Sequence, residues 1–197
     1  MAITIDGSGT VTGISAGGLP DGVITTDDIA AGAVTQAKRS EQLTLGTAQA
    51  STSGTSIDFT GIPSWVKRIT VMFNGVSTSG TSSYQIQAGN GSFVTTGYVS
   101  SAIGGTTGNV MSGNFATSGF VINTNVLAAS QHTGSFVISN ITANTWIQSG
   151  NIILEGSGSG QLSSGRIALS GTLDRIRITT VNGTDTFDAG SINILYE

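Results

Sequence analysis

Apolar and polar residues alternate along most of the chain with a period of two, which is typical of β-strands. In VKRITVMFNGV (66–76) the residues on one face are Ile69, Val71 and Phe73. The spacing predicts about eight to ten short strands. The other segments with this alternation are YQIQAG (84–89, with Tyr84, Ile86 and Ala88 on one face), GSFVISN (134–140), WIQSGNIILE (146–155), RIALSG (166–171), LDRIRITT (173–180) and SINILYE (191–197).

Turn residues separate these segments. Asn74-Gly75, Asn90-Gly91 and Asn182-Gly183 are dipeptides that tolerate positive φ and favour tight hairpins. Gly-Ser stretches such as 156–160 mark further turns. Many short strands joined by frequent turns predict an all-β fold for residues 42–197, namely an antiparallel β-sandwich similar to a jelly roll.

Residues 1–41 have a different pattern and are predicted to form an extended N-terminal arm. The segment MAITIDGSGTVTGIS predicts a short strand pair around Asp6 to Gly9. Residues 27–39 have the features of one short helix, with Thr26 or Asp27 at its N-cap.

Three apolar residues of the arm, Ile24, Ile29 and Val34, recur every five positions. This spacing fits neither a strand face nor a helix stripe. A segment of this size with a handful of small apolar residues buries no core by itself. We therefore expect the arm to pack against another chain or a host surface.

The chain has few charged residues, 9% of the total against roughly 25% in ordinary globular chains. Its 29 Gly, 28 Thr and 26 Ser favour strands and turns and argue against a helical bundle. From Ile69 through Leu154, 86 consecutive positions contain no Asp, Glu, Lys or Arg. With a net charge of −4 and no basic cluster larger than a pair, the sequence predicts no nucleic-acid partner.

The composition excludes several further classes of protein. The absence of cysteine rules out a disulfide scaffold, a cysteine zinc site and thiol catalysis. The N-terminus has no basic or apolar run, and no apolar stretch approaches the roughly 20 residues that cross a bilayer. We expect a protein made in the cytoplasm that does not insert into a membrane.

Two parts of the chain resemble known virion proteins. Residues 3–14 (ITIDGSGTVTGI), 15–22 (SAGGLPDG) and 24–38 (ITTDDIAAGAVTQAK) resemble the N-terminal segments of tailed-bacteriophage fibre and appendage proteins, in which similar units wind around a three-fold axis. The C-terminal part is similar to a β-rich module of phage structural proteins. The residues that carry this similarity are 54–82 (GTSIDFTGIPSWVKRITVMFNGVSTSGTS), TTGY (95–98) and 173–197 (LDRIRITTVNGTDTFDAGSINILYE).

The resemblance implies a structural protein of the virion, a homotrimeric tail or head fibre without a cofactor. Its N-terminal arm would dock to a capsid, neck or tail component, and its β-domain would project outward, where a host-surface glycan is an expected partner. Ile24, Ile29 and Val34 would meet at the trimer axis and form a core there. The chain departs from long fibres because it has only one shaft-like unit, so direct receptor binding and an adaptor role are both open.

Catalysis by paired carboxylates would require two acids about 5 to 10 Å apart in a cleft. The candidates are Asp174, Asp185 and Asp188. Their positions beside turns and strand ends favour hydrogen bonds to local backbone instead. We therefore predict neither a catalytic residue nor a metal site, since a single histidine without cysteine makes zinc improbable.

Three further residues are candidates for contact with a glycan. Tyr84 and Tyr98 lie beside uncharged, hydroxyl-rich segments, where an aromatic ring can stack on a sugar. His132 lies in the polar run AASQHTGS and is either a ligand contact or a solvated loop residue. The alternatives to a fibre are a non-catalytic carbohydrate-binding module and, third, a glycan hydrolase, because a β-sandwich suits each of them.

Overall fold

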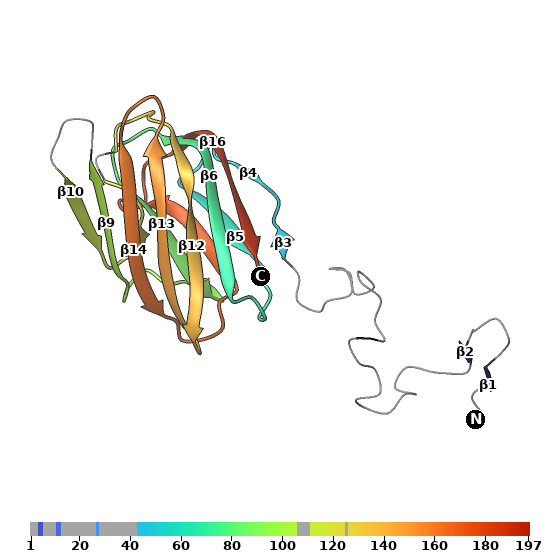
Figure 1. Ribbon diagram of the computed structural model, residues 1–197. Helices are drawn as coiled ribbons and strands as arrows, with labels where there is room; N and C mark the ends of the chain where they lie inside the picture. The colour runs from blue at the N-terminus through green and yellow to red at the C-terminus, as the bar shows by residue number, and fades with distance from the viewer. Residues whose placement is uncertain (1–3, 6–10, 13–26, 28–42, 106–110, 125) are drawn as a thin grey trace. The chain divides into compact units, whose positions relative to one another are not determined.

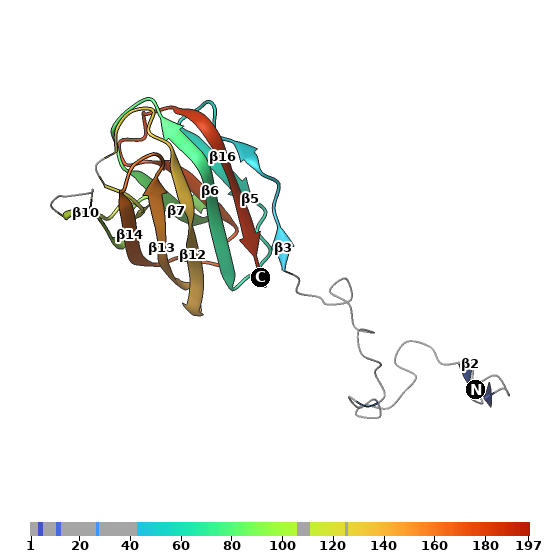
Figure 2. The same cartoon turned by 45° about the horizontal axis from the view of Figure 1, so that its top comes forward.

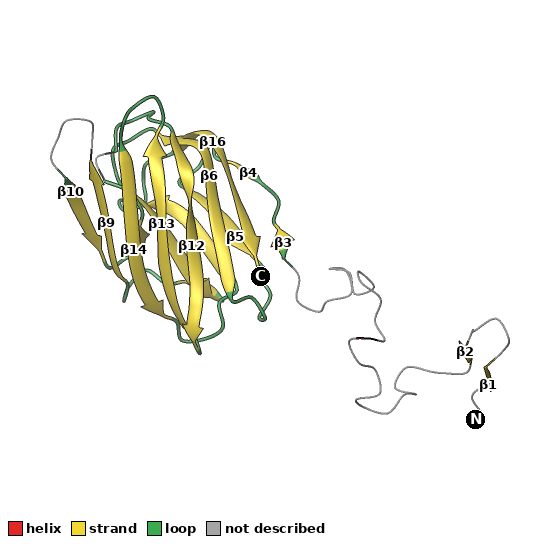
Figure 3. Cartoon of the chain, viewed as in Figure 1, coloured by secondary structure: helices red, strands yellow, loops and turns green. Residues whose placement is uncertain are grey.

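The structure, a computed structural model, describes residues 4–5, 11–12, 27, 43–105, 111–124 and 126–197, and its ordered elements are almost entirely strands (Figure 1; Figure 3). The chain divides into two compact units, Met1–Gln42 and Leu43–Glu197. In the first unit, β1 (Thr4–Ile5) pairs antiparallel with β2 (Val11–Thr12), which confirms the predicted strand pair. The helix expected at 27–39 lies outside the described residues, apart from Asp27.

The second unit contains a large antiparallel sheet (Figure 1). The view of Figure 2 shows its long central strands side by side. In spatial order its strands are β10 (Ser112–Ala116), β9 (Val99–Gly105), β14 (Gly160–Ala168), β13 (Thr145–Leu154), β12 (His132–Thr142), β6 (Arg68–Thr78), β16 (Phe187–Tyr196) and β3 (Thr44–Leu45), and β4 (Gln49–Ala50) also pairs with β16.

A smaller antiparallel sheet covers one face of the large one and completes a β-sandwich, as the alternation predicts. Its strands are β11 (Phe120–Val121), β7 (Tyr84–Asn90), β15 (Arg175–Thr180) and β5 (Ser56–Thr60), and β8 (Ser92–Phe93) pairs with β7.

The core lies between the two sheets and contains the residues that the period of two assigns to buried faces. Ile69, Val71 and Phe73 of β6 are at most 3% exposed, and Tyr84, Ile86 and Ala88 of β7 are fully buried. Phe73 meets Phe136 of β12 edge to face, with ring centroids 5.8 Å apart, a geometry that adds to the hydrophobic gain of burial.

The Asn-Gly dipeptides adopt positive φ at glycine, but two of the three predicted hairpins are wrong. Asn90-Gly91 forms the tight connection between β7 and β8. Asn74-Gly75 instead lies inside β6 as a bulge, because β6 continues past it to pair with β12 and β16. Asn182-Gly183 lies in the connection that crosses from β15 in the small sheet to β16 in the large one.

The predicted number of strands is too low. Residues 44–196 form the strands β3 to β16, and three of those that the periodicity missed are β9, β10 and β11. β9 and β10 are rich in Ser, Gly and Ala, which provide little apolar contrast between faces. β11 consists of only two residues, too few for an alternation to be seen. Among the described residues, no helix is long and apolar enough to span a membrane.

Candidate functional site

The structure corrects the expectation that Tyr84, Tyr98 and His132 contact a glycan at the surface. Their side chains are 0%, 1% and 1% exposed, so a ligand on the surface does not reach them. The Tyr98 hydroxyl accepts a hydrogen bond from the Ala88 N–H (2.8 Å) and donates one to the Ala88 carbonyl oxygen (3.2 Å). Its ring meets Phe120 edge-on at 5.0 Å, and burial raises its pKa.

His132 begins β12 and is a buried residue, not the solvated loop residue that its polar neighbours suggested. Its ring lies 5.1 Å from that of Tyr84 in an edge-to-face pair. Its Nδ1 lies 2.9 Å from the Ser130 carbonyl oxygen, whereas Nε2 has no hydrogen-bond partner. Burial raises the pKa of Tyr84 to about 12 and lowers that of His132.

The buried imidazole gives an expected pH dependence of stability. Because the folded chain lowers the pKa of His132 below its ordinary value of 6.5, the unfolded chain binds this proton more readily than the folded one. The contribution of the neutral His132 to stability is therefore fully present above pH 6.5 and is lost as the pH falls below it. We expect the Tm of the protein to decrease between pH 7 and pH 5, and His132→Phe to remove that decrease. Calorimetry across this range tests it, and equal pH profiles for the two proteins would contradict it.

The three candidate carboxylates take part in separate hydrogen-bond networks of turns and strands. Asp174 is paired with Arg175, which lowers the pKa of the carboxyl, and accepts from the Gly91 N–H at 3.1 Å. Asp185 accepts from the Ser82 N–H at 2.9 Å. The six residues of β15 lie between Asp174 and the loop of Asp185, a separation of about 20 Å along an extended strand.

Asp188 completes this set at the start of β16, where it accepts a hydrogen bond from the Ser77 hydroxyl. Among the described residues, no group of three or more His, Asp or Glu side chains is placed to hold a metal ion.

Ile24, Ile29 and Val34, expected at a trimer axis, lie outside the described residues.

A polar groove of about 300 Å³ lies on the outer face of the small sheet. It forms because β15 pairs with β7 in a register that sets Arg177 beside Gln87 and Thr179 beside Gln85. Residues from neighbouring segments form its rim. Its complete lining is Thr55, Ser56, Gln85, Gln87, Thr95, Ser118, Arg177, Thr179, Thr180, Val181, Asn182 and Gly183.

Hydrogen bonds hold the floor of the groove in place. Gln85 accepts from the Ser118 hydroxyl at 2.8 Å and donates to the Thr180 carbonyl oxygen at 3.3 Å. Gln87 donates to the Ser118 carbonyl oxygen at 3.0 Å. Both amides are nearly buried, at 3% and 6% exposure. These bonds make the floor a fixed polar surface, since both amides are anchored to Ser118 and that of Gln85 also to Thr180.

A fixed cation lies at one side of the groove. Arg177 donates two hydrogen bonds to the Asp58 carboxylate, both of 2.7 Å, a bidentate geometry that sets the plane of the guanidinium. The guanidinium also lies 4.1 Å from the centre of the Phe93 ring. Asp58 raises the pKa of Arg177. The cation is therefore held from two sides and presents its remaining surface to the groove.

The groove offers amides, hydroxyls and one guanidinium, and its lining contains no histidine, lysine or carboxylate. Such groups hydrogen-bond a neutral polyhydroxylated molecule by donating and accepting. They lack the general base that activates a hydroxyl nucleophile. The groove therefore offers hydrogen-bond donors and acceptors to a polar ligand.

The alternation of residues along the strands predicts which side chains of the groove point outward, but it does not predict that these side chains lie together. The alternation that buries Tyr84 and Ile86 also turns Gln85 and Gln87 outward, and LDRIRITT turns Arg177 outward in the same way. The missing step is the pairing of β7 with β15, two strands that lie far apart in the sequence.

No family model matches the chain, and neither a curated protein nor a solved structure matches it.

Proposed function

We propose that the chain is a non-catalytic structural protein of a tailed-phage particle, a short homotrimeric tail or head fibre. Residues 1–41 dock to a capsid, neck or tail component, and the β-sandwich projects outward for attachment to the host surface. The observation that carries the proposal is the resemblance of 3–38 to fibre attachment segments, together with the division of the chain into compact units at Gln42.

The composition of the sandwich supports a role outside the cell. The uncharged run from Ile69 to Leu154 supplies the strands β7 to β13 and most of β6. A surface of hydroxyls and backbone is little affected by ionic strength, because screening acts only on charges. This property suits a particle that meets media of varied salt content.

Deletion of residues 1–41 tests the docking role of the arm. We expect the shortened chain to retain the strand content of the sandwich by circular dichroism, and to be missing from particles assembled in cells that express it in place of the full chain. Particles that contain the shortened chain at the full-length level would contradict the proposal.

A carbohydrate-binding module without virion attachment is the second candidate, and the polar groove favours it. This candidate would use the same sandwich and groove as the fibre, but its arm would have no role in particles, so the arm deletion distinguishes the two.

A glycan hydrolase is the third candidate. It would require glycan cleavage that substitution of Asp174, Asp185 or Asp188 abolishes.

Filling the groove should weaken binding of neutral oligosaccharides. Thr95 is exposed at the groove rim, so Thr95→Trp blocks the groove without entering the core. We expect its dissociation constant for a glycan found by array screening to rise at least about tenfold, as measured by calorimetric titration. Thr96→Trp, exposed beside it and outside the lining, is the matched control. Equal affinity of Thr95→Trp and the unaltered chain would refute glycan binding in the groove.

A further inference from the structure

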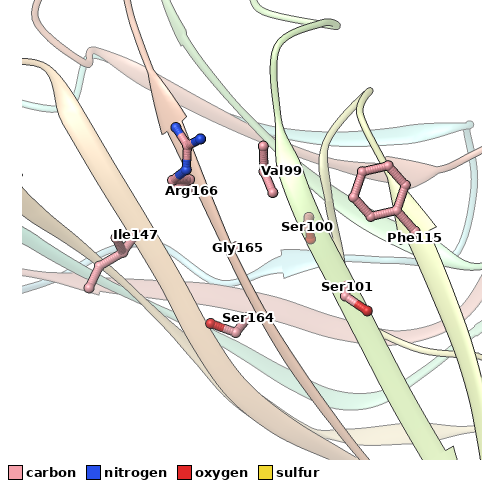
Figure 4. A pocket seen from close by; sticks show the side chains of 8 residues that line it. All are labelled: Val99, Ser100, Ser101, Phe115, Ile147, Ser164, Gly165 and Arg166. Carbon is pink, nitrogen blue, oxygen red and sulfur yellow. The ribbon is translucent and has the colours of Figure 1, made fainter.

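The outer face of the large sheet carries a hollow of about 390 Å³, formed where β10, β9, β14 and β13 follow one another in the sheet (Figure 4). Sites for small molecules have volumes of about 300–1,000 Å³. The hollow shares no lining residue with the polar groove, which belongs to the small sheet. It is therefore a second place on the sandwich where a ligand of the size of a sugar can lie.

The cation of this hollow is Arg166 of β14. The strand register places it beside Val99 of β9 and Ile147 of β13. The four strands β9, β10, β13 and β14 contain no other charged residue. In the part of the chain that the structure describes, the other three arginines each pair with a carboxylate, whereas no carboxylate pairs with Arg166. Its guanidinium is therefore available to an anion from solution.

Exposed apolar side chains surround the cation. The exposed fractions are 64% for Phe115, 45% for Val99 and 41% for Ile147. In Figure 4 the Phe115 ring and the Arg166 guanidinium lie on either side of Val99. Exposed apolar residues are ordinary when scattered, but a contiguous group marks a contact with another molecule. The walls of the hollow therefore suit an apolar surface of a ligand, and the cation beside them suits a negative charge on the same ligand.

Two serine hydroxyls next to these walls add hydrogen-bond acceptors. Ser101 of β9 lies beside Ser164 of β14. The Ser101 hydroxyl donates to the Asn114 carbonyl oxygen and that of Ser164 donates to the Gln148 carbonyl oxygen, both at 3.1 Å. Because each hydroxyl has one proton and two lone pairs, its oxygen can still accept a hydrogen bond. The hollow therefore also suits a ligand that carries hydroxyl donors.

These features together select one class of ligand. A polyanion or an anionic lipid surface binds in proportion to the number of cations, and this face offers one. A fatty acid carries a carboxylate and an apolar chain but no hydroxyl donor for the serines. An acidic sugar has a carboxylate that matches the planar guanidinium, a face of C–H groups that can pack on an aromatic ring, and several hydroxyls.

We propose that this hollow binds an acidic sugar residue of a host-surface glycan, with its carboxylate on Arg166, its C–H face on Phe115 and its hydroxyls on the two serines. The proposal rests on the proposed attachment to the host surface and names the ligand class of a second site. It differs from the polar groove of the small sheet, whose cation is already paired with Asp58.

Calorimetric titration of the full chain tests the site with four ligands: the methyl glycosides of glucuronic acid and of N-acetylneuraminic acid, methyl glucoside as a neutral sugar, and hexanoate as an apolar acid. Arg166→Gln removes the charge, and Phe115→Ala removes the ring. Lys67→Gln is the matched control, because it removes one exposed cation that lies before β6 and outside the hollow.

We expect at least one acidic glycoside to bind more tightly than methyl glucoside and hexanoate. Arg166→Gln and Phe115→Ala should each raise its dissociation constant at least about fivefold, with the strand content by circular dichroism unchanged, whereas Lys67→Gln should leave the constant unchanged. An unaltered chain that binds neither acidic glycoside, or variants that bind them equally well, would overturn this site. Either result leaves the fibre proposal standing, since that proposal fails only if the chain is absent from the particles.

Discussion

Ile138→Ala is expected to lower the free energy of unfolding by about 2–5 kcal/mol, the range for deleting a buried aliphatic side chain to alanine. Ile138 is fully buried in β12, where it lies between the two sheets and pairs in register with Ile69 of β6. The substitution removes these contacts and leaves a cavity. In a chain of this size the loss corresponds to a fall in Tm of roughly 10 °C, which calorimetry measures directly.

Ile141→Ala provides the matched control, since it makes the same chemical change three residues further along the chain. Ile141 is 56% exposed, so its truncation should change stability by no more than about 0.5 kcal/mol. Equal losses in the two variants would contradict the assignment of the sandwich core.

Gly190→Ala is expected to destabilise the protein by about 2–5 kcal/mol, from the sum of backbone strain and overpacking. Gly190 has a φ of 87° and lies in a bulge of β16 opposite the Gly75 bulge of β6. A Cβ at Gly190 would lie 2.6 Å from the Asn74 carbonyl oxygen and closer still to that of Gly75. Both oxygens belong to the backbone of β6, which is paired with β16, so they cannot move away freely.

Gly183→Ala separates the two causes of this loss. Its φ of 69° is also positive, but no atom lies within 4 Å of the position of its Cβ. It should therefore show the backbone strain alone, about 1–2 kcal/mol. Chemical unfolding of the three proteins measures the difference, and a Gly190→Ala loss no larger than that of Gly183→Ala would argue against the close approach of the two bulges.

The faces of the longer strands were predictable from the sequence because burial follows the period of two. The same rule placed Ile69 and Val71 of β6 in the core and, by its complement, turned Gln85 and Gln87 of β7 outward. The groove itself was not predictable, because Arg177 comes to lie beside Gln87 only through pairing of strands remote in sequence. Strand pairing over long separations is a property of the whole fold.

The prediction of surface aromatic contacts failed where local composition and tertiary packing disagree. Tyr84 has polar neighbours in the sequence, but it shares a strand face with Ile86 and is therefore buried with it. His132 follows the polar run AASQ, yet its ring packs against Tyr84 from the opposite sheet. Nothing local to His132 signals that contact, because its partner lies 48 residues away in the sequence.

The central claim is that the chain is a component of the virion. If the proposed phage origin holds, the genome that encodes the chain produces particles, and the most direct test is immunogold electron microscopy of those purified particles with an antibody raised against the sandwich. The account predicts gold label at one fixed position on the particles, on the head, the neck or the tail. Particles without label, with the chain found only free in the lysate, would contradict it.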